Sequence, residues 1–531
     1  MTAARPVGGV GAADAATQQS TRPATVYLVG AGPGDPGLLT VRARELLDTC
    51  DAVVYDALAN PELLGGRNAD ERRPPELHFV GKRGGDGQSA RQEEINGLLI
   101  RLGREGKRTV RLKGGDPLVF GRGSEEAQAL AAAGVPFEIV PGVTAGIAAP
   151  AYAGIPVTHR GIATSVTFVA GHEDPTKDEP QTDWQALARA GGTIVLYMGV
   201  KRLTSIAAAL VAGGMPGGTP AAAVQWGTYA RQRTVVATVA TLAERVAAER
   251  LAAPVITVIG QAVRLREEIA WFERRALFGR RILVTRARAQ AGALSERLRE
   301  LGADVLEAAA TRVEPLDPAP LCEAIGRLGT AAGYEWVVFT SQNAVRLFWE
   351  QLRAAGRDAR AFAGSTVCAV GPATGEALLA HGIAVDVVPE RFVAEGVLEA
   401  LAGRADVPGA RVLYATADRA RDALPQGLRD MKAEVEVVPI YRSVVEGTGA
   451  DALRAALTEG AVDLVTFTSA SAVRGFIAAV GPELASRAPA ASIGPITTEA
   501  ARAAGMTVAI EASESTIPGL VEAIVGAAER G

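Results

Sequence analysis

Short apolar runs that end in Gly- or Pro-rich turns alternate with amphipathic stretches along most of the chain. Between residues 24 and 172 the apolar runs include VYLVGAG, DAVVYD, HFVGKRGG and VRLKGGDP, and the stretches 92–100 and 124–134 have helical periodicity. Such β-α alternation predicts an α/β layer with a mostly parallel sheet and a ligand at the carboxyl ends of its strands. Ser124 is expected to cap the helix that it begins.

The pattern continues after the polar loop 173–183. The runs TIVLYMGV, PAAAVQWGT and APVITVIG alternate with helical stretches at 201–212 and 240–250. We therefore expect two α/β lobes, at about 24–140 and 141–272, with a ligand cleft between them. Residues 273–280 are expected to form a linker. Residues 1–23 are rich in Ala, Gly, Gln, Ser and Thr and predict a disordered extension; a transit peptide, the alternative, would carry more Arg.

From residue 281 a new series of strand, turn and helix begins, and it contains an internal repeat. Phe339-Thr340-Ser341 recurs as Phe467-Thr468-Ser469, and Gly371-Pro372 recurs as Gly494-Pro495. The repeat predicts two similar α/β lobes. The Ser, Thr and Gly residues at the turns are either helix caps or receptors for carboxylates.

The loop after the first apolar run resembles a dinucleotide-binding fingerprint. Gly32, Gly34 and Gly37 match GxGxxG, and Asp56 follows the next apolar run. Pro33 and Pro36, however, have no N–H to give to a phosphate. The loop therefore suits a ligand without phosphates, and a nicotinamide-dependent dehydrogenase is the alternative.

The segment VRLKGGDPLVFGRG (110–123) is the most informative part of the chain. Gly114 and Gly115 allow the backbone to approach a flat ligand closely, Asp116 offers a carboxylate, and Pro117 fixes the direction in which the chain leaves. The alternative interpretation is an ordinary surface turn.

The composition of the chain argues against several classes of protein and kinds of site. At 531 residues the chain is too long for a single core, and a net charge of -4 argues against a general nucleic-acid or membrane-surface binder. The 3 Cys and 4 His show no metal-ligand spacing, so His159 and His172 are expected to form hydrogen bonds in loops. No apolar run suggests a membrane span or signal peptide, and we expect a cytoplasmic protein.

Nine segments follow one another over about residues 24–272: VGAGPGDPGLLT, VVYDAL, VGKRGG, QEEIN, VRLKGGDPLVFGRG, VPGVTAG, AYAGIPVTHRG, YMGV and QWGT. In this order they resemble uroporphyrinogen-III C-methyltransferase of the tetrapyrrole methylase family. The resemblance implies that S-adenosylmethionine binds, with S-adenosylhomocysteine as its product, at Pro33, Gly114, Gly115, Asp116, Val119, Thr144, Ala145, Met198 and Gly227.

The same resemblance implies a proton acceptor at Asp56 and a proton donor at Lys82. A carboxylate at the end of a strand is a reasonable acceptor for the proton that a methylated pyrrole loses. Alternatively, Asp56 is a turn or helix-capping residue, and Lys82 is a solvated charge that attracts an acidic substrate. Gly146 departs from the family pattern, because relatives often have other small residues there.

The second half resembles uroporphyrinogen-III synthase over about residues 280–528, through FTSQNAV, VGPAT, FTSASAV and IGPIT. The resemblance implies one lobe at about 281–315 plus 443–531 and another at about 316–442, with crossings at 311–315 and 437–442. No cofactor is expected. Tyr441 is expected to assist departure of the substrate hydroxyl, or else to be a core tyrosine. The expected substrate-binding residues are Thr340, Ser341, Thr468, Ser469 and Gly494.

Together the resemblances imply a two-lobed tetrapyrrole methylase followed by a two-lobed α/β synthase. Such a bifunctional enzyme would close hydroxymethylbilane to uroporphyrinogen III with inversion of ring D. It would then methylate that product at C2 and C7 to give precorrin-2, on the route to corrinoids and sirohaem. We expect small tetrapyrroles as partners, no nucleic acid or membrane, and a homodimer through the methyltransferase half. A non-catalytic tetrapyrrole-binding second half is the alternative.

Overall fold

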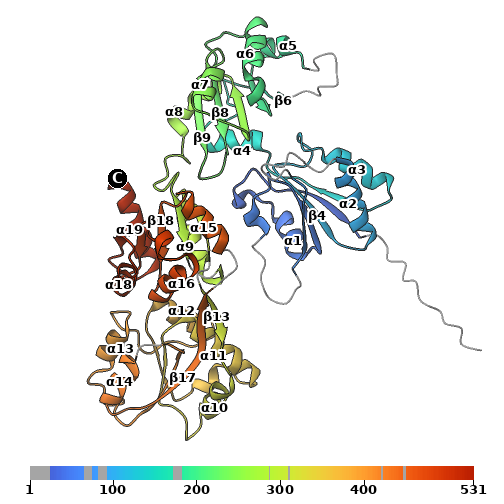
Figure 1. Cartoon of the computed structure of the whole chain (residues 1–531). Helices are drawn as coiled ribbons and strands as arrows, with labels where there is room; N and C mark the ends of the chain where they lie inside the picture. Colours follow the sequence, from blue (N-terminus) through green and yellow to red (C-terminus); the bar gives the residue numbers. More distant parts are fainter. Residues whose placement is uncertain are drawn as a thin grey trace, which may run out of the picture. The chain divides into compact units, whose positions relative to one another are not determined.

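The computed structural model describes residues 24–64, 74–81, 92–171, 182–285, 288–308, 311–419, 422–445 and 450–530. It divides into two compact units, Met1–Arg275 and Ala276–Gly531, each containing two five-stranded sheets (Figure 1). The expected extension 1–23, Lys82 and His172 lie outside the described residues. Within those described ranges, no helix is long and apolar enough to cross a bilayer.

The N-lobe (24–140) is a parallel sheet covered by helices on both faces. Its strand order is β3-β2-β4-β1-β5, and every pair is parallel. Helix α1 packs on one face and helices α2 and α3 pack on the other (Figure 1), which confirms the predicted α/β layer. The elements are β1 (Val26–Gly30), α1 (Val41–Thr49), β2 (Ala52–Tyr55), β3 (Glu76–Phe79), α2 (Gln92–Arg104), β4 (Thr109–Lys113), α3 (Gly123–Ala132) and β5 (Phe137–Val140).

The start of helix α3 differs from the prediction. The helix begins at Gly123, one residue before Ser124, and its N-cap Arg122 has a left-handed φ of 59° and no side-chain capping bond. Ser124 therefore lies inside the first turn, and its predicted capping role is wrong. Two acidic residues, Glu125 and Glu126, occupy that turn, and Glu126 is fully buried.

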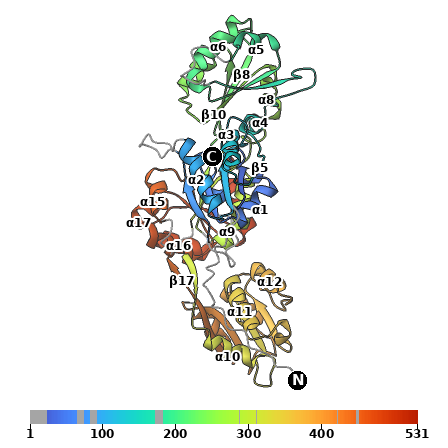
Figure 2. The same ribbon diagram turned by 90° about the vertical axis from the view of Figure 1, so that its right-hand side faces the viewer.

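The C-lobe (145–275) has a mixed sheet of order β6-β7-β10-β8-β9. Only β6 and β7 pair in parallel. Helices α5, α6 and α7 cover one face and α4 covers the other, with α5 and α6 together above β8 in Figure 2. The elements are α4 (Ala145–Tyr152), β6 (Val166–Ala170), α5 (Trp184–Ala190), β7 (Thr193–Tyr197), α6 (Leu203–Ala212), β8 (Pro220–Gln225), β9 (Arg233–Thr238), α7 (Leu242–Ala248), β10 (Val255–Ile259) and α8 (Arg266–Ile269).

The segment expected to be a linker is divided between the two units. Glu273 accepts hydrogen bonds from Gln232 and Thr234 in the first unit and pairs with Arg266. Leu277 is fully buried in a core of the second unit. Glu273 is therefore bound to the first unit and Leu277 to the second, and the division between the two units falls between them, at Arg275 and Ala276.

The terminal lobe of the second unit combines its start and its end. All pairs in its sheet, β12-β11-β18-β19-β20, are parallel. Helices α9 and α19 cover one face, and α15, α16 and α18 cover the other. The elements are β11 (Arg281–Val284), α9 (Arg288–Glu300), β12 (Asp304–Glu307), α15 (Ala450–Thr458), β18 (Leu464–Phe467), α16 (Ala470–Val480), α17 (Pro482–Ala485), β19 (Ala490–Ser492), α18 (Pro495–Ala503), β20 (Val508–Glu511) and α19 (Ile517–Arg530).

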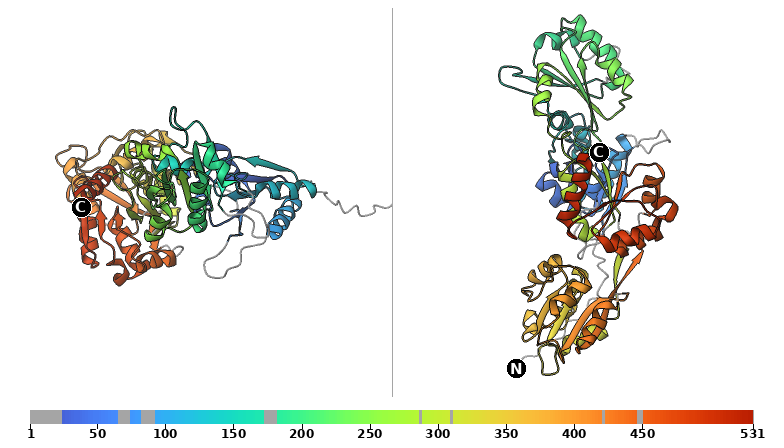
Figure 3. Two further views of the ribbon diagram at one scale, coloured as in Figure 1. Left: turned by 90° about the horizontal axis from the view of Figure 1, so that it is seen from above. Right: turned by 90° about the vertical axis from the view of Figure 1, so that its left-hand side faces the viewer.

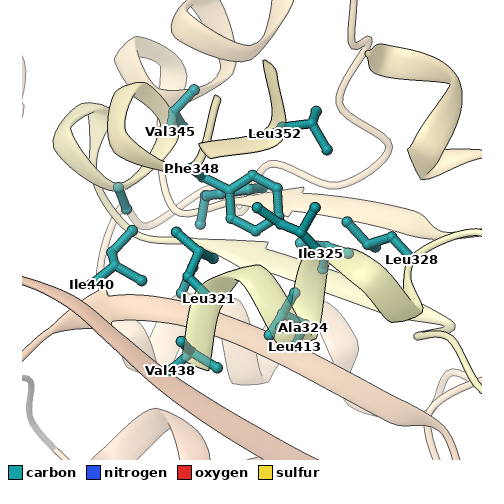
Figure 4. Close-up of a cluster of buried hydrophobic side chains, with 14 of the residues drawn as sticks. Leu321, Ala324, Ile325, Leu328, Val345, Phe348, Leu352, Leu413, Val438 and Ile440 are labelled. Atoms are coloured by element: carbon teal, nitrogen blue, oxygen red, sulfur yellow. The ribbon is translucent and has the colours of Figure 1, made fainter. Parts of the chain in front are cut away.

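The middle lobe has the sheet β13-β17-β16-β14-β15, in which only β13 is antiparallel to its neighbour. Figure 4 shows one of its two cores, where Phe348 of α11 packs among Leu321, Ile325 and Ile440. The elements are β13 (Thr311–Pro315), α10 (Ala319–Arg327), β14 (Trp336–Phe339), α11 (Gln342–Ala354), β15 (Thr366–Ala369), α12 (Pro372–Leu379), α13 (Ala394–Leu401), β16 (Arg411–Ala417), α14 (Ala423–Asp430) and β17 (Glu434–Val445).

The two expected crossings pair with each other. Strand β13 is antiparallel to the end of β17, with Pro315 opposite Tyr441. Both strands also contact α16 of the terminal lobe, and they leave the middle lobe together in the right-hand view of Figure 3. Strand 311–315 thus belongs to the middle sheet, although we expected it in the other lobe, because its hydrogen-bond partner β17 continues to Val445.

Candidate active sites

Three loops of the N-lobe meet at the carboxyl ends of β1, β4 and β5. Gly32 and Gly115 form an antiparallel bridge, with N···O distances of 3.2 and 2.7 Å. A Cβ on Gly30 would lie 2.5 Å from the Cα of Gly142 and 2.7 Å from the carbonyl oxygen of Gly115. Glycine is therefore required here, since any side chain would push the loops apart.

Asp116 holds two of these loops together. Its Oδ1 accepts from the Leu118 N–H at 2.8 Å, and its Oδ2 accepts from the Gly142 N–H at 3.0 Å. A carboxylate has about four acceptor positions. The backbone bonds therefore leave it able to contact a ligand as well, which stays a prediction. Val119, three residues further on, packs against the C-lobe core.

Tyr197, at the end of β7, ties the C-lobe to the turn that precedes α4. Its Oη lies 2.6 Å from Thr144 Oγ1 and accepts the Gly146 N–H at 2.7 Å. Burial raises the pKa of this phenol. The Tyr197 hydroxyl thus fixes Thr144 and Ala145 relative to Met198, the next residue in the chain. Sequence reasoning did not identify Tyr197, although it lies within the YMGV motif.

Backbone strain is concentrated in the same loops. Seven non-glycine residues have positive φ in the described parts of the chain, and five of them lie in the motifs VRLKGGDPLVFGRG, YMGV and QWGT. Side chains other than glycine rarely adopt this conformation, and such strain is typical of ligand sites. The five residues are Phe120, Arg122, Met198, Trp226 and Thr228.

The proline-bearing loop 33–37 is bound to the C-lobe. The Asp35 N–H donates to Thr228 Oγ1 at 3.1 Å, and Asp35 Oδ2 accepts from Tyr152 Oη at 2.6 Å. Half-buried Pro33 adjoins Gly34, where a Cβ would lie 2.1 Å from the ring of Tyr229.

This geometry disfavours a dinucleotide site. The third glycine of that fingerprint normally opens the helix that receives the pyrophosphate. Here Gly37 lies in the separate 3-10 turn Pro36–Leu38, and helix α1 begins only at Val41. Gly227, another predicted cofactor residue, lies against α4, where its Cβ would be 2.3 Å from that of Ala149.

Asp56 lies just after β2 and is partly exposed. Its Oδ1 accepts from the Leu58 N–H at 3.0 Å, the turn interaction that was its alternative interpretation. Its Oδ2 also lies 3.3 Å from Arg111 Nη2, and behind Arg111 lie the buried charges of Lys113 and Glu126. Sequence reasoning missed these three residues. The predicted proton donor Lys82 lies outside the described residues, so the structure does not test it.

His159 takes part in a backbone turn with Ala163, through hydrogen bonds of 2.8 and 2.9 Å. Among the residues that the structure describes, no three His, Cys, Asp or Glu side chains are placed to hold a metal ion.

A hydroxyl cluster lies just after β14 and beside β16 and β17 in the middle lobe. Tyr441 Oη is 3.0 Å from Ser341 Oγ, and Tyr414 Oη lies near Thr340 and Thr416, at 3.5 and 3.1 Å. Tyr441 is 8% exposed, and burial raises its pKa. The structure thus brings three predicted residues together and adds Tyr414, which a tyrosine within the apolar strand RVLYATA could have indicated.

The repeated Ser residues cap helices. Ser341 Oγ accepts from the Ala344 N–H and Ser469 Oγ from the Ala472 N–H, so the capping interpretation holds for both. Thr468 precedes Ser469 at the end of β18, and Gly494 is the N-cap of α18. Both α11 and α16 contact β17, the strand that carries Tyr441.

These folds and sites define a two-unit α/β protein. Its first unit has a strained glycine-rich site between two lobes, and its second has a hydroxyl cluster beside β17, a middle-lobe strand that also contacts α16 of the terminal lobe. A family model described as "Tetrapyrrole (Corrin/Porphyrin) Methylases" matches residues 25–243, and one described as "Uroporphyrinogen-III synthase HemD" matches residues 292–522.

Known proteins match either most of the chain or one of its units. A porphyrin biosynthesis protein HemD from Ruminiclostridium josui is 36% identical over 509 residues, which are 94% of this chain and 97% of the relative. An S-adenosyl-L-methionine-dependent uroporphyrinogen III methyltransferase from Methanosarcina barkeri is 50% identical over 242 residues, which are 46% of this chain and 93% of the relative.

A solved structure also resembles the first unit. It is a uroporphyrin-III C-methyl transferase from Thermus thermophilus complexed with S-adenosyl homocysteine, with 38% identity, coverage of 45% of this chain and 99% of that protein, and a TM-score of 0.39. On the sequence matches, the chain belongs to the tetrapyrrole methylases in its first half and to the uroporphyrinogen-III synthases in its second.

Proposed function

We propose that the chain is a bifunctional enzyme of tetrapyrrole biosynthesis. The second unit closes hydroxymethylbilane to uroporphyrinogen III, and the first unit methylates that product at two pyrrole carbons to give precorrin-2. The observation that carries the methylase assignment is the meeting of strained, glycine-rich loops from both lobes around residues 114–116, 144–146 and 198.

The residues of the first site fit S-adenosylmethionine, which would supply an electrophilic methyl group. The loops offer main-chain groups beside apolar side chains, and Leu118, Phe120 and Met198 are each between 42 and 53% exposed. Pro33 and Pro36 remove two N–H donors that a phosphate would need. The cofactor would be held by Pro33, Gly114, Gly115, Asp116, Val119, Thr144, Ala145, Met198 and Gly227.

The protein's own groups would orient the pyrrole and receive its proton. Transfer of a methyl group in line needs two reactants held in register, which the two tied lobes provide. Asp56, ordered by Arg111 and partly exposed, would accept the proton that the methylated ring loses. Lys82 keeps its proposed role as proton donor.

In the second unit the Tyr441 hydroxyl would assist departure of the substrate hydroxyl as a hydrogen-bond donor. Ser341 supports this role, because its Oγ lies 3.0 Å from Tyr441 Oη and fixes the direction of the phenol. Thr340, Thr468, Ser469 and Gly494 are proposed to bind the substrate carboxylates at the turns before helices.

The decisive experiment supplies hydroxymethylbilane with and without S-adenosylmethionine and separates the products. We expect uroporphyrinogen III without the cofactor and precorrin-2 with it. Tyr441→Phe should slow ring closure while leaving methylation of added uroporphyrinogen III unchanged. Formation of only the uncatalysed cyclic isomer would instead favour a non-catalytic binding module.

We also propose that the chain acts in the cytoplasm as a homodimer through the methylase unit, and that its product serves corrinoid and sirohaem synthesis. Light scattering on the full chain and on a fragment ending at Arg275 tests the dimer, since both should have twice their chain mass.

A further inference from the structure

Three charged side chains are buried together beneath Asp56. Arg111 and Lys113 point from β4, and Glu126 points from the first turn of α3, with side-chain exposures of 3, 6 and 0%. Glu126 Oε1 lies 3.1 Å from Arg111 Nε and 3.0 Å from Lys113 Nζ. Buried charges are costly even when paired, and apolar side chains often replace them without loss of stability. The fold alone therefore does not account for this group.

Arg111 connects the buried group to Asp56. Its Nε donates to Glu126, its Nη1 to the Leu112 carbonyl at 3.2 Å, and its Nη2 to Asp56 Oδ2 at 3.3 Å. A guanidinium is planar and rigid, so a bond at one edge fixes the direction of the others. The Glu126 carboxylate, together with the Leu112 carbonyl, thus sets the direction in which Arg111 meets Asp56.

The charges of the group balance. Two cations, Arg111 and Lys113, face two carboxylates, Asp56 and Glu126, while Gln92 Nε2 also donates to Glu126 Oε1 at 3.3 Å. Burial, followed by the charge of Arg111, lowers the pKa of Lys113. Glu126 Oε2 is buried and has no partner among the described residues. Without the Glu126 charge, Arg111 would keep Asp56 as its carboxylate partner among the described residues, and Lys113 would also be attracted to Asp56.

We propose that Glu126 is a positioning residue for methylation, which acts through Arg111 to hold Asp56 as the proton acceptor. Lys113 supplies the second positive charge that pairs with Glu126 inside the lobe. This inference rests on the proposed function of the first unit.

The test is Glu126→Gln in the full chain, which keeps the shape and removes the charge. We expect kcat for methylation of uroporphyrinogen III to fall by about 10- to 100-fold, because the acceptor is misplaced. The calorimetric affinity for S-adenosylhomocysteine and the KM for uroporphyrinogen III should not change. A residue needed only for folding would lower the affinity and the rate together.

A double-mutant cycle with Asp56→Asn tests whether Glu126 acts through Asp56. Once Asp56 cannot accept a proton, adding Glu126→Gln should slow methylation no further. Equal losses in both backgrounds would overturn the proposal. Glu125→Gln is the matched control, since Glu125 is the neighbouring, exposed residue of the same turn, and its main partner is Arg122 at the surface rather than the buried group. Its rate should equal that of the unaltered protein.

Lys113→Met/Glu126→Gln, which removes one charge of each sign, decides the outcome if the single variant does not fold. The double variant should fold and remain slow, because Arg111 still lacks its anchor. A normal rate would show that Glu126 only balances Lys113 and would overturn the proposal. Absence of methylation by the unaltered protein would overturn the proposed function, and the inference with it.

Discussion

Gly146→Ala should destabilise the first unit, although alanine is normally the better helix residue. Gly146 lies in α4, and an added Cβ would be 2.3 Å from Tyr197 Oη and 2.7 Å from the ring carbons Cε2 and Cζ. The backbone contributes no strain, since Gly146 is not among the residues with positive φ. The methyl group can be accommodated only if the buried phenol moves away.

The cost follows from what this movement breaks. Tyr197 would lose the hydrogen bond from the Gly146 N–H, 2.7 Å long, and its contact with Thr144 Oγ1, 2.6 Å long. Each bond is worth about 0.5–1.5 kcal/mol, and overpacking adds about 1–3 kcal/mol. Alanine regains about 1 kcal/mol in helix propensity. The net loss is about 3 kcal/mol, or roughly 6–12 °C in the melting temperature of a unit of this size.

Gly97→Ala is the matched control for this experiment. Gly97 lies in helix α2, and a Cβ there would meet nothing within 4 Å. This variant should gain about 0.5–1 kcal/mol, and in calorimetry of the full chain it identifies the transition of the first unit. Gly146→Ala should lower that same transition and weaken binding of S-adenosylhomocysteine. Equal melting temperatures for the two variants would refute the argument that Tyr197 is held in place.

Three further predictions follow from single contacts. Asp116→Ala should weaken S-adenosylhomocysteine binding by about 10- to 100-fold in calorimetry, because it releases the loop at Gly142 and a ligand acceptor together. A fragment ending at Phe272 should melt well below one ending at Arg275, since only the longer one contains Glu273 and its bonds to the C-lobe; equal melting would place the boundary earlier. Burial lowers the pKa of Lys113 in the folded protein below its ordinary value of 10.5, so Lys113 binds its proton more tightly in the unfolded chain. The free energy of unfolding should therefore rise with pH on the alkaline side, up to about pH 10.5. Denaturant unfolding of Lys113→Met should lack this slope.

The layered fold could be predicted because buried parallel strands are continuous apolar runs. The runs containing β1, β2 and β4 in the N-lobe all became strands of one parallel sheet. Strand β9 and helix α5 were missed, since β9 is an edge strand whose sequence RTVVAT does not alternate strictly and α5 is a short helix of 7 residues. The antiparallel pairing of the C-lobe was not predictable, because strand direction depends on connections rather than on local pattern.

In the candidate site of the first unit, the sequence predicted only those residues that belong to a local motif. Gly114, Gly115 and Asp116 are adjacent in the chain, and their chemistry is visible in the sequence. Arg111 and Glu126 lie on a strand and a helix, and each alone has the appearance of a solvated charge. Their burial together depends on how α3 packs on the sheet, which no local pattern specifies.

Helix α4 links these observations, because both of its ends are fixed to loops of the candidate site. At its start Tyr197 binds Thr144 and Gly146, and at its end Tyr152 binds Asp35. Helix α4, 8 residues long with Pro150 inside it, connects these two ends directly. The loops at 33–35 and 144–146 are therefore linked through one short helix. A methyl group at Gly146 should accordingly disturb the Tyr152–Asp35 bond as well as the local contact, and Tyr152→Phe should reproduce part of its effect on ligand binding.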